Sequence, residues 1–495
     1  MGHTLLGLDI GSSSVKASLV DGDTGKTLAH ATAPLEEMEI VSRRPGWAEQ
    51  SPDLWWDNVT VAISHIQRSN AADLTRLKAV GIAYQMHGLV LVDSAGNPLR
   101  PAIIWCDSRA VSLGESAYRT LGSEICGVRL GNSPGNFTAS KLAWVKENEP
   151  EVFARAAYFM LPGDYIAFKL TGKIGTTPSG LSEGILWDFS KSSPADFLLN
   201  HLGISGSLMP PVSPNCETFA EISPNAAEKL SIPKGVVVAY RAGDQPNNAF
   251  ALNVLNPGEV AVNAGTSGVV YGVTEKLGVD PMSRVNNFLH VTSTPKAPRV
   301  GVLMCVNGTG SFYRWIRSTV APDLSYKKIN EIAETSPVGA NGLIALPYGN
   351  GAERTLNNKI IGASLEGVDL NRHQRSDIFR AASEGIVFAL NYGLEIMREM
   401  GLSPRLARAG FANMFQSELF QRTFATVTGV PVELYSTDGS EGAARGAGIG
   451  AGLYDSSAAF AGLAKRGVVD PDHTATSATL EAYQHWKSAL LTNVS

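Results

Sequence analysis

The stretch Val236-Val237-Val238-Ala239-Tyr240, followed by Gly243-Asp244-Gln245, decides the predicted fold. The apolar run is typical of a buried strand, and the glycine opens a turn directly after it. An acidic side chain at the end of such a strand is well placed to meet a ligand. The alternative is that Asp244 caps a helix beginning near Pro246, which is the commoner use of a Gly-Asp turn.

Two corners rich in glycine and hydroxyl side chains lie in separate halves of the chain. One is Asp9-Ile10-Gly11-Ser12-Ser13-Ser14 and the other is Asn263-Ala264-Gly265-Thr266-Ser267-Gly268, and each follows a short apolar run. Glycine lets the backbone approach an anion, and successive N–H groups and hydroxyls can donate to phosphate oxygens. Each corner alone is also compatible with a plain hairpin turn. Their similarity, about half a chain apart, favours a nucleotide clamped between two related domains.

Further polar residues follow other predicted strands. Asp9 is acidic where a phosphate would be repelled, so it suits a divalent cation between the two; otherwise it can bond the amides of its own turn. Gln85-Met86-His87-Gly88 follows the buried strand 79–84, at the end where α/β proteins place ligand contacts, although a lone histidine there is more often structural. A strand over 103–109 ends in the pair Asp107 and Arg109, which we expect to be mainly structural.

Length and composition limit the class of protein. A chain of 495 residues is too long for one core, so two or more domains are expected. The net charge of -5, without a basic run, argues against nucleic acid or an anionic membrane as partner. Four scattered cysteines suit reduced, buried thiols, and we expect no signal peptide, no membrane span and a soluble cytoplasmic protein.

Other segments complete the expected organisation. Residues 171–217 are rich in Ser, Pro and Gly and are predicted to form loops around a ligand. A long helix is expected over 377–400, where apolar residues recur in helical period. A helix of small residues beginning at Ser440 can pack very tightly against a sheet.

Several segments in this order resemble the FGGY carbohydrate kinases, and the resemblance runs nearly from end to end. They are Leu8-Asp9-Ile10-Gly11, Gly46-Trp47-Ala48-Glu49-Gln50, Gln85-Met86-His87-Gly88, Ile104-Trp105-Cys106-Asp107, Phe137 to Trp144, Ala242-Gly243-Asp244, Gly265-Thr266-Ser267-Gly268-Val269 and Leu365 to Gly385. Each segment is weak evidence alone, and their order along the chain is what indicates the family.

The resemblance implies an α/β fold with two actin/hexokinase-like (ribonuclease H-type) domains flanking a central cleft. Residues 1–239 would hold the sugar-binding side and the first phosphate loop, and residues 240–495 the catalytic aspartate and the nucleotide. The implied reaction is ATP-dependent phosphorylation of a sugar hydroxyl. The Gln-Met-His-Gly segment favours D-xylulose, giving D-xylulose 5-phosphate, over glycerol, ribulose or gluconate.

The resemblance also assigns roles by position. Asp244 resembles the catalytic base, Met86, His87 and Gln245 the sugar contacts, and Asp9 the residue on the Mg²⁺ side. The residues expected at the phosphates and the rest of ATP are Ser12, Ser13, Gly265, Thr266, Ser267, Gly310, Gly410 and Asn413. A homodimer is plausible by the same resemblance.

Two departures keep alternatives open. Gln245 stands where the xylulose-specific members commonly have Asn and the glycerol-specific members have Gln, so another ketopentose or a polyol remains an alternative substrate. The nucleotide motif Gly-Gly-Gly-Ala-Lys-Ser is replaced by Ala409-Gly410-Phe411-Ala412-Asn413-Met414, which leaves the phosphoryl donor open. A non-catalytic ATP- or sugar-binding module is the rival from another class, although both aspartates are present.

The expected chemistry makes one electrostatic prediction. Phosphoryl transfer needs positioning and charge stabilisation more than a strong base, since the attacking hydroxyl keeps its proton until late. An ordinary ionised aspartate therefore suffices, and we predict no strongly raised pKa for Asp244.

Overall fold

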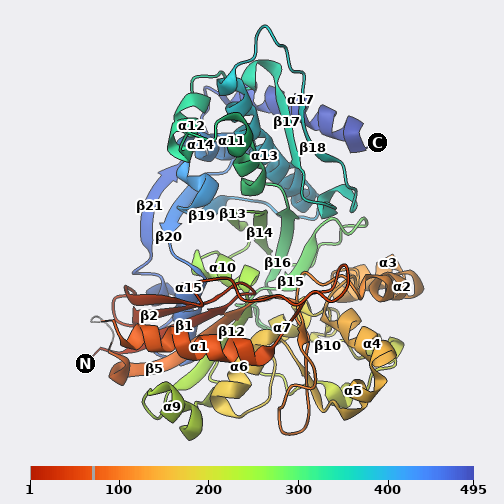
Figure 1. Ribbon diagram of the computed structural model, residues 1–495, viewed down its shortest axis with the longest axis vertical. Helices are drawn as coiled ribbons and strands as arrows, with labels where there is room; N and C mark the ends of the chain where they lie inside the picture. The colour runs from red at the N-terminus through yellow and green to blue at the C-terminus, as the bar shows by residue number, and fades with distance from the viewer. Residues whose placement is uncertain (1, 70–72, 495) are drawn as a thin grey trace. The chain divides into compact units, whose positions relative to one another are not determined.

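A computed structural model describes residues 2–69 and 73–494, and the chain forms two compact units (Figure 1). The first comprises Met1–Asn253, Phe288–Val300 and Thr437–Leu463, and the second comprises Val254–Asn287, Gly301–Ser436 and Ala464–Ser495. Each unit has a hydrophobic core of its own, as expected for this length. This division differs from the predicted boundary at 239/240. The first unit extends to Asn253 and so includes Asp244, and it also contains residues 437–463 from later in the chain.

The first unit is built on a six-stranded sheet. Its order is β11 (Ala220–Glu221), β12 (Val237–Gly243), β5 (Leu77–Tyr84), β1 (Thr4–Ile10), β2 (Val15–Asp21) and β3 (Thr27–Ala33). The strands β12, β5 and β1 are parallel neighbours, whereas β1–β2, β2–β3 and β11–β12 are antiparallel. Nearly every residue of β1, β5 and β12 is buried, as is usual for parallel strands covered on both faces.

Helix α15 (Gly439–Gly450) packs on this sheet at unusually close range. A Cβ atom on Gly7 would lie 1.7 Å from the carbonyl oxygen of Ser440, and one on Gly81 would lie 1.9 Å from that of Ala443. Only glycine permits this approach of helix and strand backbones. The predicted tight packing of the small-residue helix is confirmed.

The second unit repeats the plan of the first sheet. Its seven-stranded sheet has the order β15 (Asn286–Leu289), β16 (Val300–Val306), β14 (Gly268–Thr274), β13 (Glu259–Ala264), β19 (Leu406–Gly410), β20 (Val432–Ser436) and β21 (Ala464–Val469). The pair β13–β14 is antiparallel, β13–β19 and β19–β20 are parallel, and β20–β21 is antiparallel. This succession matches β2, β1, β5, β12 and β11, and it supports the internal repeat inferred from the two corners.

Helices cover these sheets, among them α13 (Arg375–Glu399), where the long helix over 377–400 was predicted. Helix α1 (Pro52–Gln67) buries Trp55 and Trp56 in the first core. The second core includes residues of α11 (Gly310–Val320), α13 (Arg375–Glu399), α14 (Glu418–Thr428) and α17 (Thr476–Val494). Other elements are β4 (Glu49–Gln50), β6 (Val90–Val92), β7 (Ala102–Ile103), α2 (Val111–Leu121), α4 (Thr138–Asn148), α5 (Pro150–Arg155), β8 (Tyr158–Met160), α6 (Pro162–Thr171), α9 (Pro224–Leu230), α10 (Asp244–Ala251), α12 (Tyr326–Ala333), β17 (Ile344–Tyr348) and β18 (Gly362–Glu366).

Two local predictions were wrong. The segment 171–217 contains helices α7 (Pro178–Glu183) and α8 (Asp196–His201) and the strands β9 (Trp187–Asp188) and β10 (Ser193–Pro194). Pro178 at the first helical position and a Thr177 cap that accepts the Gly180 N–H begin α7, so the turn-forming residues there start a helix. The strand expected over 103–109 is only the two residues of β7.

Two further expectations concern the state of the cysteines and the presence of membrane-spanning helices. All four cysteines are free, as predicted, but Cys126 alone is buried; Cys216 and Cys305 are partly exposed and Cys106 is exposed. Across residues 2–69 and 73–494, helices long and apolar enough to cross a membrane are absent.

Candidate active site

Three parallel strands of the first unit end side by side. Asp9 of β1 pairs with Ala83 of β5, which pairs with Ala242 of β12, and the next row along brings in Gly243. Neighbouring strands are about 4.8 Å apart, so β1 and β12 are separated by roughly 10 Å. The corner after β1, the turn after β5 and the start of α10 therefore lie at one edge of the sheet.

Asp244 is the first residue of α10 and is only partly exposed. The N-cap position belongs to Gly243, so the alternative in which Asp244 is the helix cap does not hold. Burial of the carboxyl group, followed by the charge of Asp9, raises its pKa to about 7, although hydrogen bonds from Gln245 oppose the shift. The prediction of an ordinary pKa was wrong, because it ignored both the loss of water around Asp244 and the second carboxylate.

Asp9 has its own acidic neighbour. Burial raises its pKa to about 6; Lys16, its cross-strand partner on β2, lowers the value, and Asp438 raises it. Asp438 is the N-cap of α15 and accepts the Glu441 N–H at 3.0 Å. A Cβ atom on Gly439 would lie 2.6 Å from Asp9 Oδ2, so the start of α15 reaches the Asp9 carboxylate. Asp438 was missed from the sequence because it is more than 400 residues away along the chain.

The turn after β5 places Met86 and His87 beside the start of α10. Met86 is buried, and its Cγ atom would lie 2.6 Å from a Cβ atom on Gly243. His87 is partly exposed and adopts φ 61°, in the left-handed region that few residues other than glycine visit. Gln245 follows Asp244 and is partly exposed. The predicted sugar contacts and Asp244 are thus brought together.

Glu183, at the end of α7, is a further carboxyl group at this place that the sequence did not indicate. Its Oε2 atom would lie 2.2 Å from a Cβ atom on Gly243, and the side chain is 1% exposed. Burial, then the charges of Asp244 and Asp164, raises its pKa well above the ordinary value. The sequence did not indicate Glu183 because the segment was expected to form loops, and the short helix that positions the side chain was not predicted.

The first phosphate-type corner carries Ser12 and Ser13 on the same edge. Trp105, which is half exposed, donates its Nε1–H to Ser12 Oγ at 3.3 Å, and Gln50 Nε2 donates to the Ser12 carbonyl at 2.7 Å. Ser13 is exposed. The corner is therefore held from two sides, with hydroxyl groups available for a ligand.

The second corner, in the second unit, opens onto a cavity of about 890 Å³. Gly265, Thr266, Gly310 and Asn413 line it, whereas the predicted residues Ser267 and Gly410 are not among the lining residues of the described chain. The Gly310 N–H donates to the Gly265 carbonyl at 2.8 Å. A Cβ atom on Gly310 would lie 2.3 Å from that same oxygen, so a glycine is required there.

The rest of the cavity wall consists of residues that the sequence did not single out. Phe411 is 44% exposed and takes a place where the usual family motif has glycine. Aromatic and acidic side chains complete the wall, among them Tyr313, Tyr326, Glu331, Glu334 and Glu418. A cavity of this size with aromatic and polar walls is typical of a cofactor site.

The repeated sheets, with a phosphate-type corner in each and acids at one strand edge, are those of the actin/hexokinase-like class of α/β proteins. Residues 4–251 match the N-terminal domain of the FGGY family of carbohydrate kinases, and residues 260–453 match its C-terminal domain. The chain therefore belongs to the FGGY family of carbohydrate kinases.

Relatives and solved structures agree with this assignment. A xylulose kinase of Bacillus subtilis (strain 168) is 30% identical over 399 residues, which cover 81% of this chain and 78% of that relative. A xylulose kinase of Escherichia coli (strain K12) is 29% identical, covering 89% and 88%. A crystal structure named as a xyloylose kinase from Brucella ovis is 27% identical, covers 99% of both chains and has a TM-score of 0.90. The predicted family, fold class and sugar-kinase activity are confirmed.

Proposed function

We propose that the protein transfers the terminal phosphoryl group of ATP to a hydroxyl of D-xylulose, giving D-xylulose 5-phosphate and ADP. Relatives over most of the chain carry the name xylulose kinase. The observation that carries the proposal is the shared edge of β1, β5 and β12, which gathers Asp9, Met86, His87 and Asp244.

Asp244 would serve as the base. The sugar hydroxyl oxygen attacks the terminal phosphorus, the bond from that phosphorus to the oxygen of the departing ADP breaks, and the hydroxyl proton passes to the Asp244 carboxylate. A pKa of about 7 suits this step, because a base is most effective when its pKa lies near the working pH. The raised value therefore supports the role, although we had expected an ordinary one.

The neighbouring side chains would orient the sugar. Met86 offers an apolar surface, while His87 and the amide of Gln245 offer hydrogen bonds to hydroxyl groups. Such polar contacts discriminate between sugars because a missing hydroxyl leaves a buried polar group unpaired.

Asp9 and Asp438 fit a divalent cation. Burial is the main cause of the raised pKa of Asp9, the charge of Asp438 adds to it, and a cation between the two carboxylates and the phosphates would relieve their repulsion. Mg²⁺ is usually held by one or two carboxylates, phosphate oxygens and water, and the described residues contain no group of three or more candidate ligand side chains. When bound, the ion would neutralise negative charge on the phosphates. Ser12 and Ser13 would donate to their oxygens.

The cavity of the second unit would hold the rest of the nucleotide. Gly265, Thr266 and Gly310 line it, and Asn413 and Phe411 lie on the same wall. Ser267 and Gly410 would contribute through their neighbours rather than by lining the cavity. A homodimer and a cytoplasmic location stay predictions.

A polyol such as glycerol is the second candidate substrate, and Gln245 is the observation that favours it. A coupled assay of ADP release with D-xylulose, D-ribulose, glycerol and D-gluconate separates the candidates. The proposal expects kcat/KM for D-xylulose to exceed the others by at least tenfold. A higher value for glycerol or ribulose, or ADP release that does not depend on sugar, would contradict it.

A further inference from the structure

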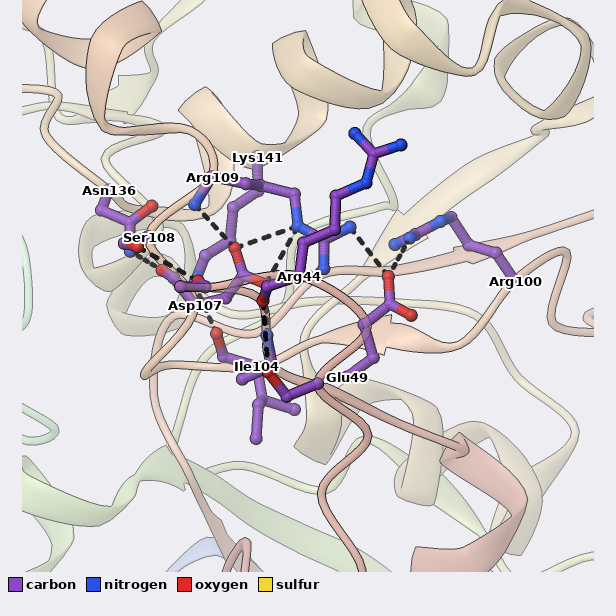
Figure 2. Close-up of polar contacts among 12 residues, drawn as sticks. Arg44, Glu49, Arg100, Ile104, Asp107, Ser108, Arg109, Asn136 and Lys141 are labelled. Carbon is purple, nitrogen blue, oxygen red and sulfur yellow. Dashed lines mark hydrogen bonds and ion pairs between the residues drawn. The ribbon is translucent and has the colours of Figure 1, made fainter.

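A fully buried lysine lies behind the predicted sugar contacts. Lys141 belongs to α4, is 0% exposed, and donates from Nζ to the His87 carbonyl at 2.8 Å and to the Ile104 carbonyl at 2.9 Å. Figure 2 shows the lysine beside Asp107 and Arg109. Its two hydrogen bonds therefore join the turn after β5 to the turn after β7.

Keeping an ammonium group at this depth is costly. Burial lowers the pKa of Lys141 to about 7, and Arg109 adds to the shift, while Asp107, Cys106 and Glu183 oppose it. The acids nearby are already engaged, since Asp107 accepts from Arg109 and from the Ala48 N–H. A buried ammonium group is unfavourable unless its N–H groups are hydrogen-bonded, and here two of them donate to backbone carbonyls. We infer that the position of those carbonyls is important.

One of the two carbonyls belongs to a residue in an unusual conformation. His87 has φ 61°, which costs free energy in a residue with a side chain and persists only where the surroundings impose it. Strain of this kind gathers at ligand-binding positions. Lys141 holds the carbonyl of this strained residue, while the backbone N–H of His87 bonds the Glu183 carboxylate.

The imidazole of His87 is fixed separately. Nδ1 lies 2.9 Å from the Glu183 carbonyl oxygen, and because a carbonyl only accepts, Nδ1 carries the proton. In the tautomer that carries this proton, Nε2 can accept a hydrogen bond. Phe137 packs edge-on against the ring at 4.6 Å, and Phe288 lies at 5.5 Å. The side chain is thus held as an oriented hydrogen-bond acceptor.

We propose that Lys141 is a positioning residue for the sugar: it locks the His87 backbone in its left-handed conformation, so that Nε2 accepts a hydrogen bond from a sugar hydroxyl. The inference rests on the proposed function, which makes His87 a sugar contact. Lys141 acts through His87 and does not touch the substrate.

Lys141→Met keeps the length and apolar stem but removes the donors. We expect KM for D-xylulose to rise about tenfold to a hundredfold, the effect of losing hydrogen bonds from a charged group, with kcat and the nucleotide KM changed less than about twofold. Lys146→Met is the matched control. Lys146 is on the same helix and donates to the Leu202 carbonyl at 2.9 Å, away from this turn, so its loss should leave KM unchanged.

A double-mutant cycle separates positioning from general damage. If Lys141 acts through His87, then adding Lys141→Met to His87→Ala leaves KM where His87→Ala alone puts it. Additive effects, or a fall in kcat at constant KM, would overturn the proposal. Should Lys141→Met not fold, Lys141→Gln replaces it, and failure of both to fold would make Lys141 a folding residue and overturn the proposal too. An unchanged KM in His87→Ala alone would instead refute the sugar contact, and the role of Lys141 would fall with it.

Discussion

The two corners share a backbone plan but differ in charge. Asp9 stands before the first corner, and Asn263 stands at the same place before the second. At the first corner, burial first and neighbouring carboxylates second raise the pKa of Asp9 and of Asp244. The second opens onto a large cavity with aromatic walls. In the proposed function both turns bind phosphate oxygens, and the carboxylates around the first corner take part in proton transfer and cation binding.

The largest effect should come from Asp244, the proposed base, which lies beside the first corner. Asp244→Asn keeps the shape but cannot accept a proton, so kcat should fall by about 10²–10⁴. Calorimetry should still detect sugar binding. Asp196→Asn, which alters an exposed acid in the first turn of α8, is the control and should retain full activity. Turnover within a few-fold of normal in Asp244→Asn would remove this residue from the base role.

At the second corner, a steric clash should weaken nucleotide binding. In Gly310→Ala the new methyl group would lie 2.3 Å from the Gly265 carbonyl oxygen and push the corner out of place. We expect the nucleotide KM to rise about tenfold to a hundredfold while the sugar KM stays near normal, measured by steady-state kinetics. Gly467→Ala, in the same unit but with open space around the position, is the control. Equal effects of both substitutions would refute the close contact.

The pH dependence of kcat/KM should show the raised pKa of Asp244, which results from burial and from the charge of Asp9. Asp244 accepts a proton only when ionised, so kcat/KM should fall about tenfold per pH unit below its pKa of about 7 and level off above it. Asp9→Asn removes a negative charge that raises this pKa, so the midpoint measured at saturating nucleotide should move to lower pH. A midpoint that stays in place would show that Asp9 does not act on Asp244.

The smallest effect should come from giving the second corner the charge of the first. Asn263→Asp places a carboxylate before Gly265, where the proposal puts phosphate oxygens. Water and salt screen the repulsion between an exposed carboxylate and the phosphates. We therefore expect the nucleotide KM to rise about threefold to tenfold, and less at high salt. An unchanged KM at low salt would argue against phosphates at this corner.

The sequence was sufficient for the strands and corners because apolar runs and glycine turns are local signals. The strand predicted over 79–84 lies within β5, the apolar run from Val236 leads into β12, and α15 packs as its small residues suggested. The raised pKa of Asp244 could not be predicted, since it depends on burial and on Asp9, more than 200 residues away. Glu183 was hidden because a proline and a threonine cap begin a short helix where only loops were expected.

The central claim is that the first unit holds the sugar and the second holds the nucleotide. Calorimetric titration of His87→Ala and Gly310→Ala, each with D-xylulose and with ADP, tests it most directly. We expect His87→Ala to lose sugar affinity and keep ADP affinity, and Gly310→Ala to show the reverse. Loss of both affinities in either variant that still melts cooperatively, or loss of the opposite ligand, would contradict the account.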